Sequence, residues 1–156
     1  MRERRNRAER FRLPMSRKAA VAVKQAYARV RILLVDDHPT IRKMVRSVLE
    51  EHPRFEVCGE AVDGAKAIEA ADSLKPDVVI LNVTMPVLNG IEAARVIRIR
   101  APDSAIVILS THADERLIEE SKRIGVRAYV AKARTGEVLV QAIEAAIEGG
   151  SFVLMD

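Results

Sequence analysis

Four strand-like segments of this sequence are each followed by polar side chains that could bind a metal ion or an anion. The segments are residues 32–35, 77–81, 105–109 and 127–131. Carboxylates, an amide, hydroxyls and an ammonium group stand directly after them. The residues concerned are Asp36, Asp37, Asn82, Ser110, Thr111 and Lys132.

These residue types suit the transfer of a phosphoryl group with the help of magnesium. Adjacent carboxylates such as Asp36 and Asp37 suit Mg²⁺, which binds a few carboxylates and keeps several waters. The ammonium group of Lys132 and the hydroxyl of Ser110 could bind phosphoryl oxygens. A carboxylate at position 82 could form an acyl phosphate, but the neutral amide of Asn82 cannot attack phosphorus at a useful rate. The set therefore has the groups that stabilise a transfer and lacks the nucleophile.

The elements that must position these groups alternate along the chain. Short apolar runs rich in Val, Ile and Leu predict buried strands, and apolar residues at helical spacing predict helices between them. Pro39 suits the first turn of a helix, and Thr135 and Ser16 are candidate helix caps. The predicted strands are 32–35, 55–61, 77–81, 105–109 and 127–131, and the predicted helices are 39–51, 64–74, 91–100, 114–124 and 136–148.

Alternating strands and helices of this length predict an α/β domain with a parallel sheet. Right-handed crossovers place helices on both faces, which gives a doubly wound, five-stranded (βα)₅ sheet. In a parallel sheet all carboxyl ends lie at one edge, where such folds bind ligands. The polar residues after the strands should therefore converge on one site.

Several short motifs carry a resemblance to a known family. Residues 30–150 resemble the receiver domain of bacterial two-component response regulators, which implies the flavodoxin-like strand order 2-1-3-4-5. The stretches 109–112 and 142–150 are similar to the NarL-like subgroup. The matching residues are Leu33-Leu34-Val35-Asp36-Asp37-His38, Met85-Pro86, Gly90, Ser110, and Tyr129 three residues before Lys132.

The resemblance implies a role for each site residue. Asp37 would bind Mg²⁺ directly, Asp36 through water, and Thr84 through its backbone carbonyl. Lys132 would bind the phosphoryl group. Ser110 and Tyr129 would form the conformational switch. Asn82 would occupy the phosphoacceptor and metal-binding position, inactive as an acceptor and with weakened Mg²⁺ binding.

The family has aspartate where this chain has Asn82. Three origins fit this departure: an engineered acceptor knock-out, a natural receiver that no longer uses phosphate, or a sequence error. The resemblance implies a histidine kinase or phosphotransfer protein as partner, and a protein-binding face formed by the helix at 114–124, the strand at 127–131 and the helix at 136–148. The leading interpretation is a signalling module that is not an enzyme and does not turn over.

Two alternatives remain open. The chain could be the receiver part of a DNA-binding regulator whose helix-turn-helix output domain is missing, or a natural phosphate-independent pseudo-receiver that binds protein. NarL-like proteins continue into such a DNA-binding domain, and we expect none in this chain. A flavodoxin-like cofactor binder or small α/β enzyme is disfavoured, because no Gly-rich phosphate loop follows the first strand and aromatic residues make up only 3% of the chain.

The charge divides the chain into a basic start and a mildly acidic domain. Residues 1–29 hold ten Lys/Arg and two Glu, whereas the rest holds 16 Lys/Arg and 20 Asp/Glu. We expect a flexible basic extension at 1–29, a receiver domain at 30–150 and a tail at 151–156. The extension is a solvated tail, an arm for an acidic partner such as nucleic acid or an anionic membrane surface, or the product of a misassigned start before Met15.

Composition also bounds the location of the protein. A single cysteine, Cys58, excludes an intramolecular disulfide and suits a reducing compartment. No apolar run approaches the ~18 residues of a membrane span, and no apolar segment of a signal peptide follows the N-terminal arginines. We therefore expect a cytoplasmic protein.

Overall fold

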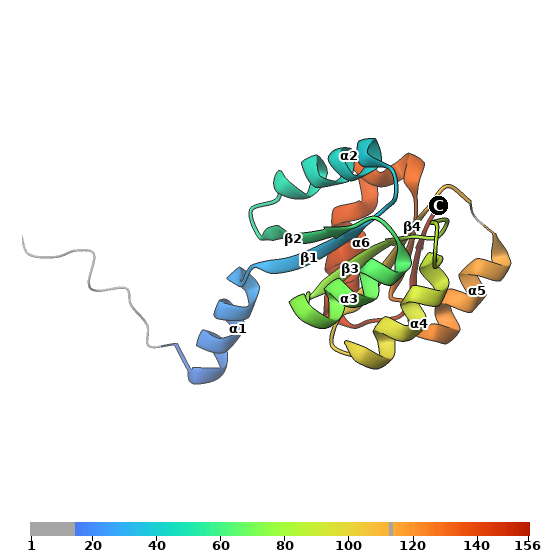
Figure 1. Ribbon diagram of the computed structural model, residues 1–156. Coiled ribbons are helices and arrows are strands. Elements are labelled where there is room, and N and C mark those ends of the chain that lie inside the picture. Colours follow the sequence, from blue (N-terminus) through green and yellow to red (C-terminus); the bar gives the residue numbers. More distant parts are fainter. Residues whose placement is uncertain (1–14, 113) are drawn as a thin grey trace, which may run out of the picture.

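A computed structural model describes residues 15–112 and 114–156, with the backbone alone for 25–27 (Figure 1). Strands and helices alternate along the chain as predicted. The strands are β1 (Val30–Val35), β2 (Phe55–Ala61), β3 (Val78–Asn82), β4 (Ala105–Ser110), β5 (Ala128–Ala131) and β6 (Val153–Met155). The helices are α1 (Arg17–Tyr27), α2 (Pro39–Glu50), α3 (Gly64–Leu74), α4 (Gly90–Arg100), α5 (Glu115–Ile124), α6 (Thr135–Glu148) and the short 3₁₀ helix η2 (Lys132–Arg134).

The strands of the described chain form one parallel sheet in the order β2-β1-β3-β4-β5-β6. The prediction of five strands was wrong by one. The first five have the predicted order, and β6 adds a sixth strand beside β5, with Val153 opposite Ala128 and Met155 opposite Val130. This strand of three residues falls in the segment predicted as a tail. It is too short for an alternating pattern to reveal it.

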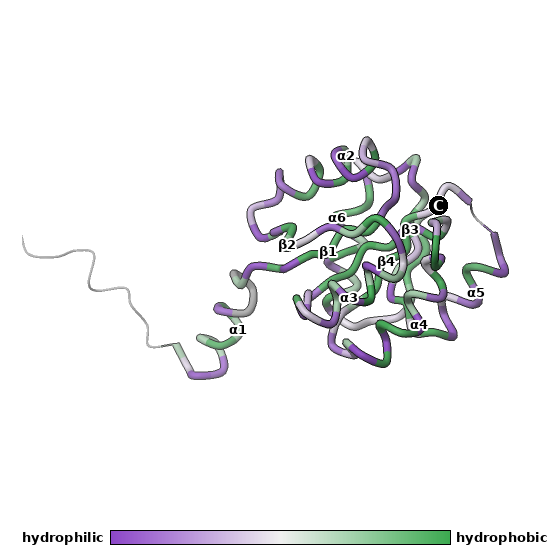
Figure 2. The backbone as a smooth tube through the Cα atoms, in the orientation of Figure 1, coloured by the Kyte–Doolittle hydropathy of each residue, from purple (hydrophilic) through white to green (hydrophobic). Residues whose placement is uncertain are grey.

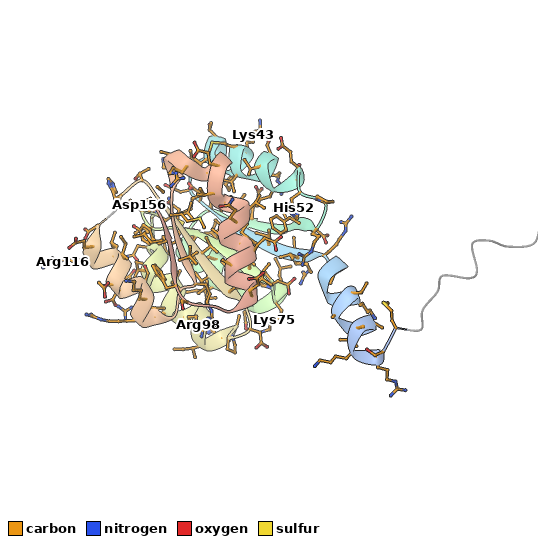
Figure 3. The ribbon with its side chains drawn as sticks, turned by 180° about the vertical axis from the view of Figure 1, so that it is seen from behind. Lys43, His52, Lys75, Arg98, Arg116 and Asp156 are labelled. Atoms are coloured by element: carbon orange, nitrogen blue, oxygen red, sulfur yellow. The ribbon has the colours of Figure 1, made fainter. Side chains whose placement is uncertain are left out.

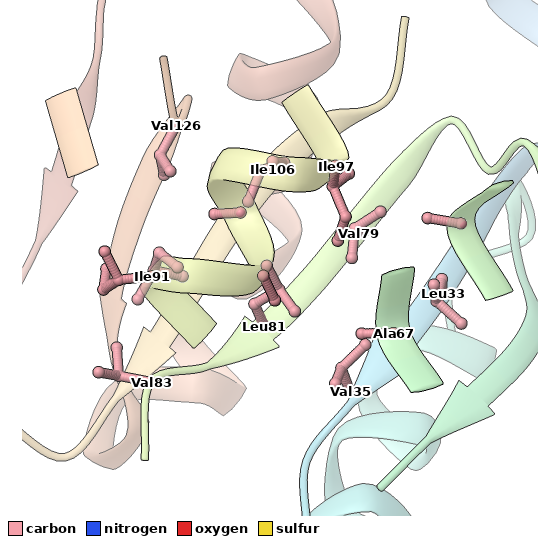
Figure 4. Close-up of a cluster of buried hydrophobic side chains, with 14 of the residues drawn as sticks. Leu33, Val35, Ala67, Val79, Leu81, Val83, Ile91, Ile97, Ile106 and Val126 are labelled. Atoms are coloured by element: carbon pink, nitrogen blue, oxygen red, sulfur yellow. The ribbon is translucent and has the colours of Figure 1, made fainter. Parts of the chain in front are cut away.

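Helices cover both faces of the sheet, as Figure 1 shows. Successive side chains of a strand point to opposite faces, so neighbours such as Leu33 and Leu34 belong to different apolar clusters. One cluster packs under α3, α4 and α5 and includes Leu33, Val79 and Ile106 (Figure 4). The other packs under α2 and α6. Figure 2 shows the hydrophobic strands at the centre, with hydrophilic stretches along the helices.

Local signals fix the starts of most helices. Pro39 begins α2, as predicted. Asp63, Asn89 and Asp114 cap α3, α4 and α5, each accepting a backbone N–H with its side chain. Thr135 does not cap α6 as predicted, because it is the first residue of that helix and its hydroxyl donates to the carbonyl of Lys132 at 2.8 Å. The 3₁₀ turn of η2 leads directly into α6 and takes the place of a side-chain cap.

The helix α1 lies outside the packed domain (Figure 1). Ser16 accepts the N–H of Ala19 at 3.1 Å, which confirms the predicted cap. Side chains 15–24 are exposed except for the half-buried Ala19. The predicted basic extension before residue 15 lies outside the described residues. No helix of the described chain is both long and apolar enough to span a membrane.

Candidate functional site

The carboxyl edge of the sheet holds the predicted site residues. Asp36 and Asp37 follow the last residue of β1, and Asn82 and Ser110 are the last residues of β3 and β4. Lys132 follows β5 as the first residue of η2. The parallel register of β1, β3 and β4 puts these ends side by side. The structure therefore brings the predicted residues to one edge, where direct contacts arrange them in three groups.

The first group is an ion pair between Asp36 and Lys132. The Lys132 ammonium lies 2.8 Å from one Asp36 oxygen, and the side chains are 11% and 2% exposed. The other Asp36 oxygen accepts the backbone N–H of His38 at 2.9 Å. Removing one partner of such a shielded pair leaves the other charge uncompensated. The pair therefore fixes η2 against the end of β1.

The second group centres on the side-chain amide of Asn82. Its nitrogen donates to an Asp37 carboxylate oxygen at 3.1 Å and to the Thr84 carbonyl at 2.8 Å. These are the two oxygens that the family resemblance assigns to Mg²⁺. An N–H₂ group has two donors and no acceptor, so it suits both oxygens. Asn82 is buried, and its amide bridges two groups that would otherwise face each other as acceptors.

This arrangement decides how well the site fits a metal ion. Ligand atoms of Asp36, Asp37 and His38 lie within 4.8 Å of one another. The Asp37 and Thr84 oxygens, however, are bonded to N–H donors, and a donor hydrogen repels a cation. As arranged, these two oxygens do not fit an ion shared between them.

The residues named as a switch form a third group around the backbone of His112. The Ser110 hydroxyl accepts the His112 N–H at 3.1 Å. The Tyr129 hydroxyl donates to the His112 carbonyl at 2.6 Å. The Tyr129 side chain is 1% exposed, and burial raises the pKa of its phenol above the ordinary value. In this structure Tyr129 thus lies inside the domain, bonded to the loop that follows β4.

Two contributions to the site escaped the sequence analysis. The His38 imidazole Nδ1 lies 3.1 Å from an Asp37 oxygen and 3.3 Å from an Asp36 oxygen, although the sequence analysis gave His38 no role in the site. Its place next to two aspartates was the available signal. The second contribution is the backbone of His112, which no side-chain pattern could indicate.

Gly90 keeps the loop after β3 close to the site. Its N–H donates to the Val83 carbonyl at 2.8 Å, and a β-carbon at this position would collide with the Asn82 carbonyl oxygen. Only glycine permits this approach. Within the same loop Val87 has φ 69° and a largely exposed side chain. The loop that follows β3 is therefore closely packed at one end and projects at Val87.

The face expected to bind a protein partner has an additional component. The elements α5, β5 and α6 lie where the sequence placed them, but β6 pairs with the outer edge of β5. Phe152, just before β6, packs against the apolar cluster under α5, with the Lys122 ammonium 5.3 Å from its ring centre. The edge of β5 is thus covered by the chain itself.

Comparison with known proteins identifies relatives of this chain. The sequence model of one protein family, the response regulator receiver domain, matches residues 32–144. The uncharacterized transcriptional regulatory protein YxjL of Bacillus subtilis is 40% identical over 121 residues, which cover 78% of this chain and 56% of that protein. The transcriptional regulatory protein DegU of Brevibacillus brevis is 32% identical, with coverage of 80% and 53%. The chain spans about half the length of these relatives.

Other matches extend this result to known structures and to a different protein class. A two-component response regulator of the LuxR family from Aurantimonas is 35% identical, with a TM-score of 0.76 and coverage of 81% of this chain and 89% of that one. A protein-glutamate methylesterase of Pyrococcus horikoshii is 45% identical over 80 residues, 51% of this chain and 22% of that protein. The same kind of domain thus occurs with different associated functions.

Proposed function

The chain belongs to the response regulator receiver domain family, and we propose that it is a two-component signalling module whose acceptor position cannot take a phosphoryl group. A carboxylate oxygen is the nucleophile of an acyl phosphate, and the neutral amide of Asn82 has none. The remaining groups for phosphoryl transfer are present at the same edge. We therefore propose that the site keeps the groups that bind a phosphoryl group and lacks the nucleophile that would form a covalent bond with it.

One observation carries this proposal. The Asn82 amide donates to both Asp37 and Thr84, so the position of the missing nucleophile is stabilised by the chain itself. Asp37 and the Thr84 carbonyl thus accept from the Asn82 amide, and Asp36 pairs with Lys132, so each of these acceptors has a partner within the chain. We propose that Mg²⁺ binding is weakened as a result. Where Mg²⁺ binds, it would supply charge stabilisation for a phosphoryl group, and Asp36 and Asp37 would hold it.

The proposed partners follow from the family and the surface. A histidine kinase or phosphotransfer protein would meet the carboxyl edge of the sheet. A further protein would bind α5, β5 and α6 together with β6, in a manner independent of phosphorylation. We propose a cytoplasmic, non-enzymatic role, and a basic segment before residue 30 that could meet an acidic partner.

A second candidate function is favoured by the relatives. Several are named transcriptional regulators, and this chain matches about half of their length. The chain would then be the receiver part of a DNA-directed regulator, with its output domain encoded outside residues 1–156. Sequencing the native gene through position 82 and beyond position 156 separates this candidate from a stand-alone receiver, and it also decides the origin of Asn82.

The acceptor assignment is tested by intact-protein mass after incubation with acetyl phosphate and Mg²⁺. We expect no added phosphoryl group on the native chain and one on Asn82→Asp. The matched control is Asn82→Asp combined with Lys132→Ala, which keeps the nucleophile, lacks the phosphoryl-binding ammonium, and should be modified much more slowly. A modified native chain would show that the acceptor lies elsewhere. An unmodified Asn82→Asp variant would show that the site has lost more than its nucleophile and would favour a phosphate-independent binding module.

A further inference from the structure

A second polar site lies at the opposite edge of the sheet, where the strands begin. A cavity of about 290 Å³ opens there. Its walls include the residue that directly precedes each of the first five strands. These residues are Arg29, Arg54, Asp77, Ser104 and Arg127.

A fourth arginine reaches this cavity from a helix. Arg98 belongs to the last turn of α4 and lines the same space. Figure 3 places Arg98 well away from Asp156, which follows β6 at the other end of the strands. Four arginines from four separate segments therefore line one cavity. The sheet fixes the backbone around it: the Val30 N–H donates to the Arg54 carbonyl at 2.7 Å, and the Arg127 N–H donates to the Ile106 carbonyl at 2.8 Å.

Among the described residues, ion pairs neutralise one of these four positive charges. Arg54 pairs with Glu144 at 3.5 Å. Within residues 15–112 and 114–156, no carboxylate lies within ion-pair distance of Arg29, Arg98 or Arg127. Arg127 donates instead to the Gly149 and Gly150 carbonyls. The two acidic residues of the lining, Asp77 and Asp103, leave the cavity with an excess of positive charge.

One arginine of the lining has a buried donor without an acceptor among the described residues. Arg98 donates through one terminal nitrogen to the Pro102 carbonyl at 3.0 Å. Its Nε is buried and has no acceptor among the described residues. A buried donor without a partner has a desolvation cost that native structures normally avoid. The Nε lies beside Gly125, and a reorientation of this guanidinium toward an anion in the cavity would give its N–H groups an acceptor.

We propose that this cavity binds a small phosphorylated compound with at least two negative charges. A guanidinium fork binds phosphate oxygens in pairs. The several oxygens of a phosphate can accept from arginines on different sides, whereas the two oxygens of a carboxylate match fewer of them. The volume is at the small end of the range for ligand sites, which suits a phosphate or diphosphate with a small attached group. The site is distinct from the acceptor edge and does not depend on the function proposed for Asn82.

The test is a calorimetric titration of the full chain with sodium pyrophosphate, without divalent cations and at constant ionic strength. We expect a Kd on the order of 0.1 mM, a modest affinity for several charge-assisted contacts. The double variant Arg98→Gln/Arg127→Gln should bind at least ~10-fold more weakly. The matched control, Arg17→Gln/Lys18→Gln, removes the same charge from the exposed helix α1 and should change the Kd less than about twofold.

Two further measurements keep the result interpretable. If the double variant folds poorly, Arg29→Gln replaces an exposed cavity residue and should still weaken binding about threefold. Citrate, a carboxylate polyanion, should bind clearly more weakly than pyrophosphate. Equal weakening by the α1 variant would show that pyrophosphate binds the basic segment, and equal binding of citrate would show a general charge effect. Either result, or no binding by the native chain, would overturn the proposal.

Discussion

The side-chain nitrogen of Asn82 lies 3.1 Å from a carboxylate oxygen of Asp37, and it donates a hydrogen bond to that oxygen. In the active members of this family the resemblance places a second carboxylate at position 82, with a metal ion between the two. Here a neutral donor meets the Asp37 carboxylate directly. Asn82 therefore holds the Asp37 carboxylate by a hydrogen bond that needs no metal.

Magnesium affinity should respond to the donor at position 82. We expect Asn82→Asp to bind Mg²⁺ at least ~10-fold more tightly than the native chain, which corresponds to about 1.4 kcal/mol. The physical reason is that an oxygen ligand replaces an N–H group directed at the ligands. Isothermal titration calorimetry measures the difference. Asn82→Ala is the control, because it removes the donor without adding charge, and its affinity should fall between the two. Equal affinity of the native and Asp forms would contradict the role given to the amide.

Stability without metal should change in the opposite direction. Asn82→Asp removes two hydrogen bonds and places a third carboxylate beside Asp36 and Asp37. We expect a loss on the order of 1 kcal/mol in the free energy of unfolding, since solvent at an open site screens the repulsion. Urea melts with and without Mg²⁺ measure it, and the ion should restore part of the loss by binding the folded state. If both forms are equally stable without metal, the acidic groups are not close enough to repel.

Tyr129 should make stability depend on alkaline pH. Burial raises the pKa of its phenol in the folded state, so the folded chain holds this proton more tightly than the unfolded chain. Its contribution is fully present below the unfolded pKa of about 10 and is lost as pH rises from there through the raised folded pKa. The urea midpoint should therefore fall more in the native chain than in Tyr129→Phe when the pH is raised from 8 to above 10. At pH 8 the variant should lose about 1 kcal/mol, because the His112 carbonyl loses its donor. Parallel pH profiles of the two proteins would contradict this account.

Two glycines should respond oppositely to the same substitution. Gly90→Ala places a β-carbon against the Asn82 carbonyl oxygen, so the loop after β3 must shift. We expect a loss of at least ~2 kcal/mol, in the range of strain from overpacking. Gly136→Ala is the control: apart from the adjoining residues and the backbone of the helix itself, nothing lies within 4 Å of an added β-carbon, and alanine favours the helix α6 by up to ~1 kcal/mol. Thermal melts of both variants decide this, and a neutral Gly90→Ala would show that the loop is not packed as described.

The sequence by itself determined the order of the elements and the edge that carries the site. Short apolar runs such as residues 78–81 predict buried strands, and the helical spacing between them predicts crossover helices. Parallel strands place their carboxyl ends together, so the convergence of Asp36, Asn82 and Lys132 on one edge followed from chain order alone. These inferences rest on local patterns that the backbone period imposes.

Only the tertiary structure decided how those side chains pair. The amide of Asn82 faces Asp37 and Thr84, while Lys132 takes Asp36. The same was true of β6, whose three residues show no period and form a strand only because β5 offers an unpaired edge. The residues that precede the strands look like ordinary surface positions in the sequence. Three of them, Arg29, Arg54 and Arg127, line one cavity only because the sheet places the starts of its strands side by side. In each case the deciding interaction joins segments far apart in the chain, so the folded geometry selects it.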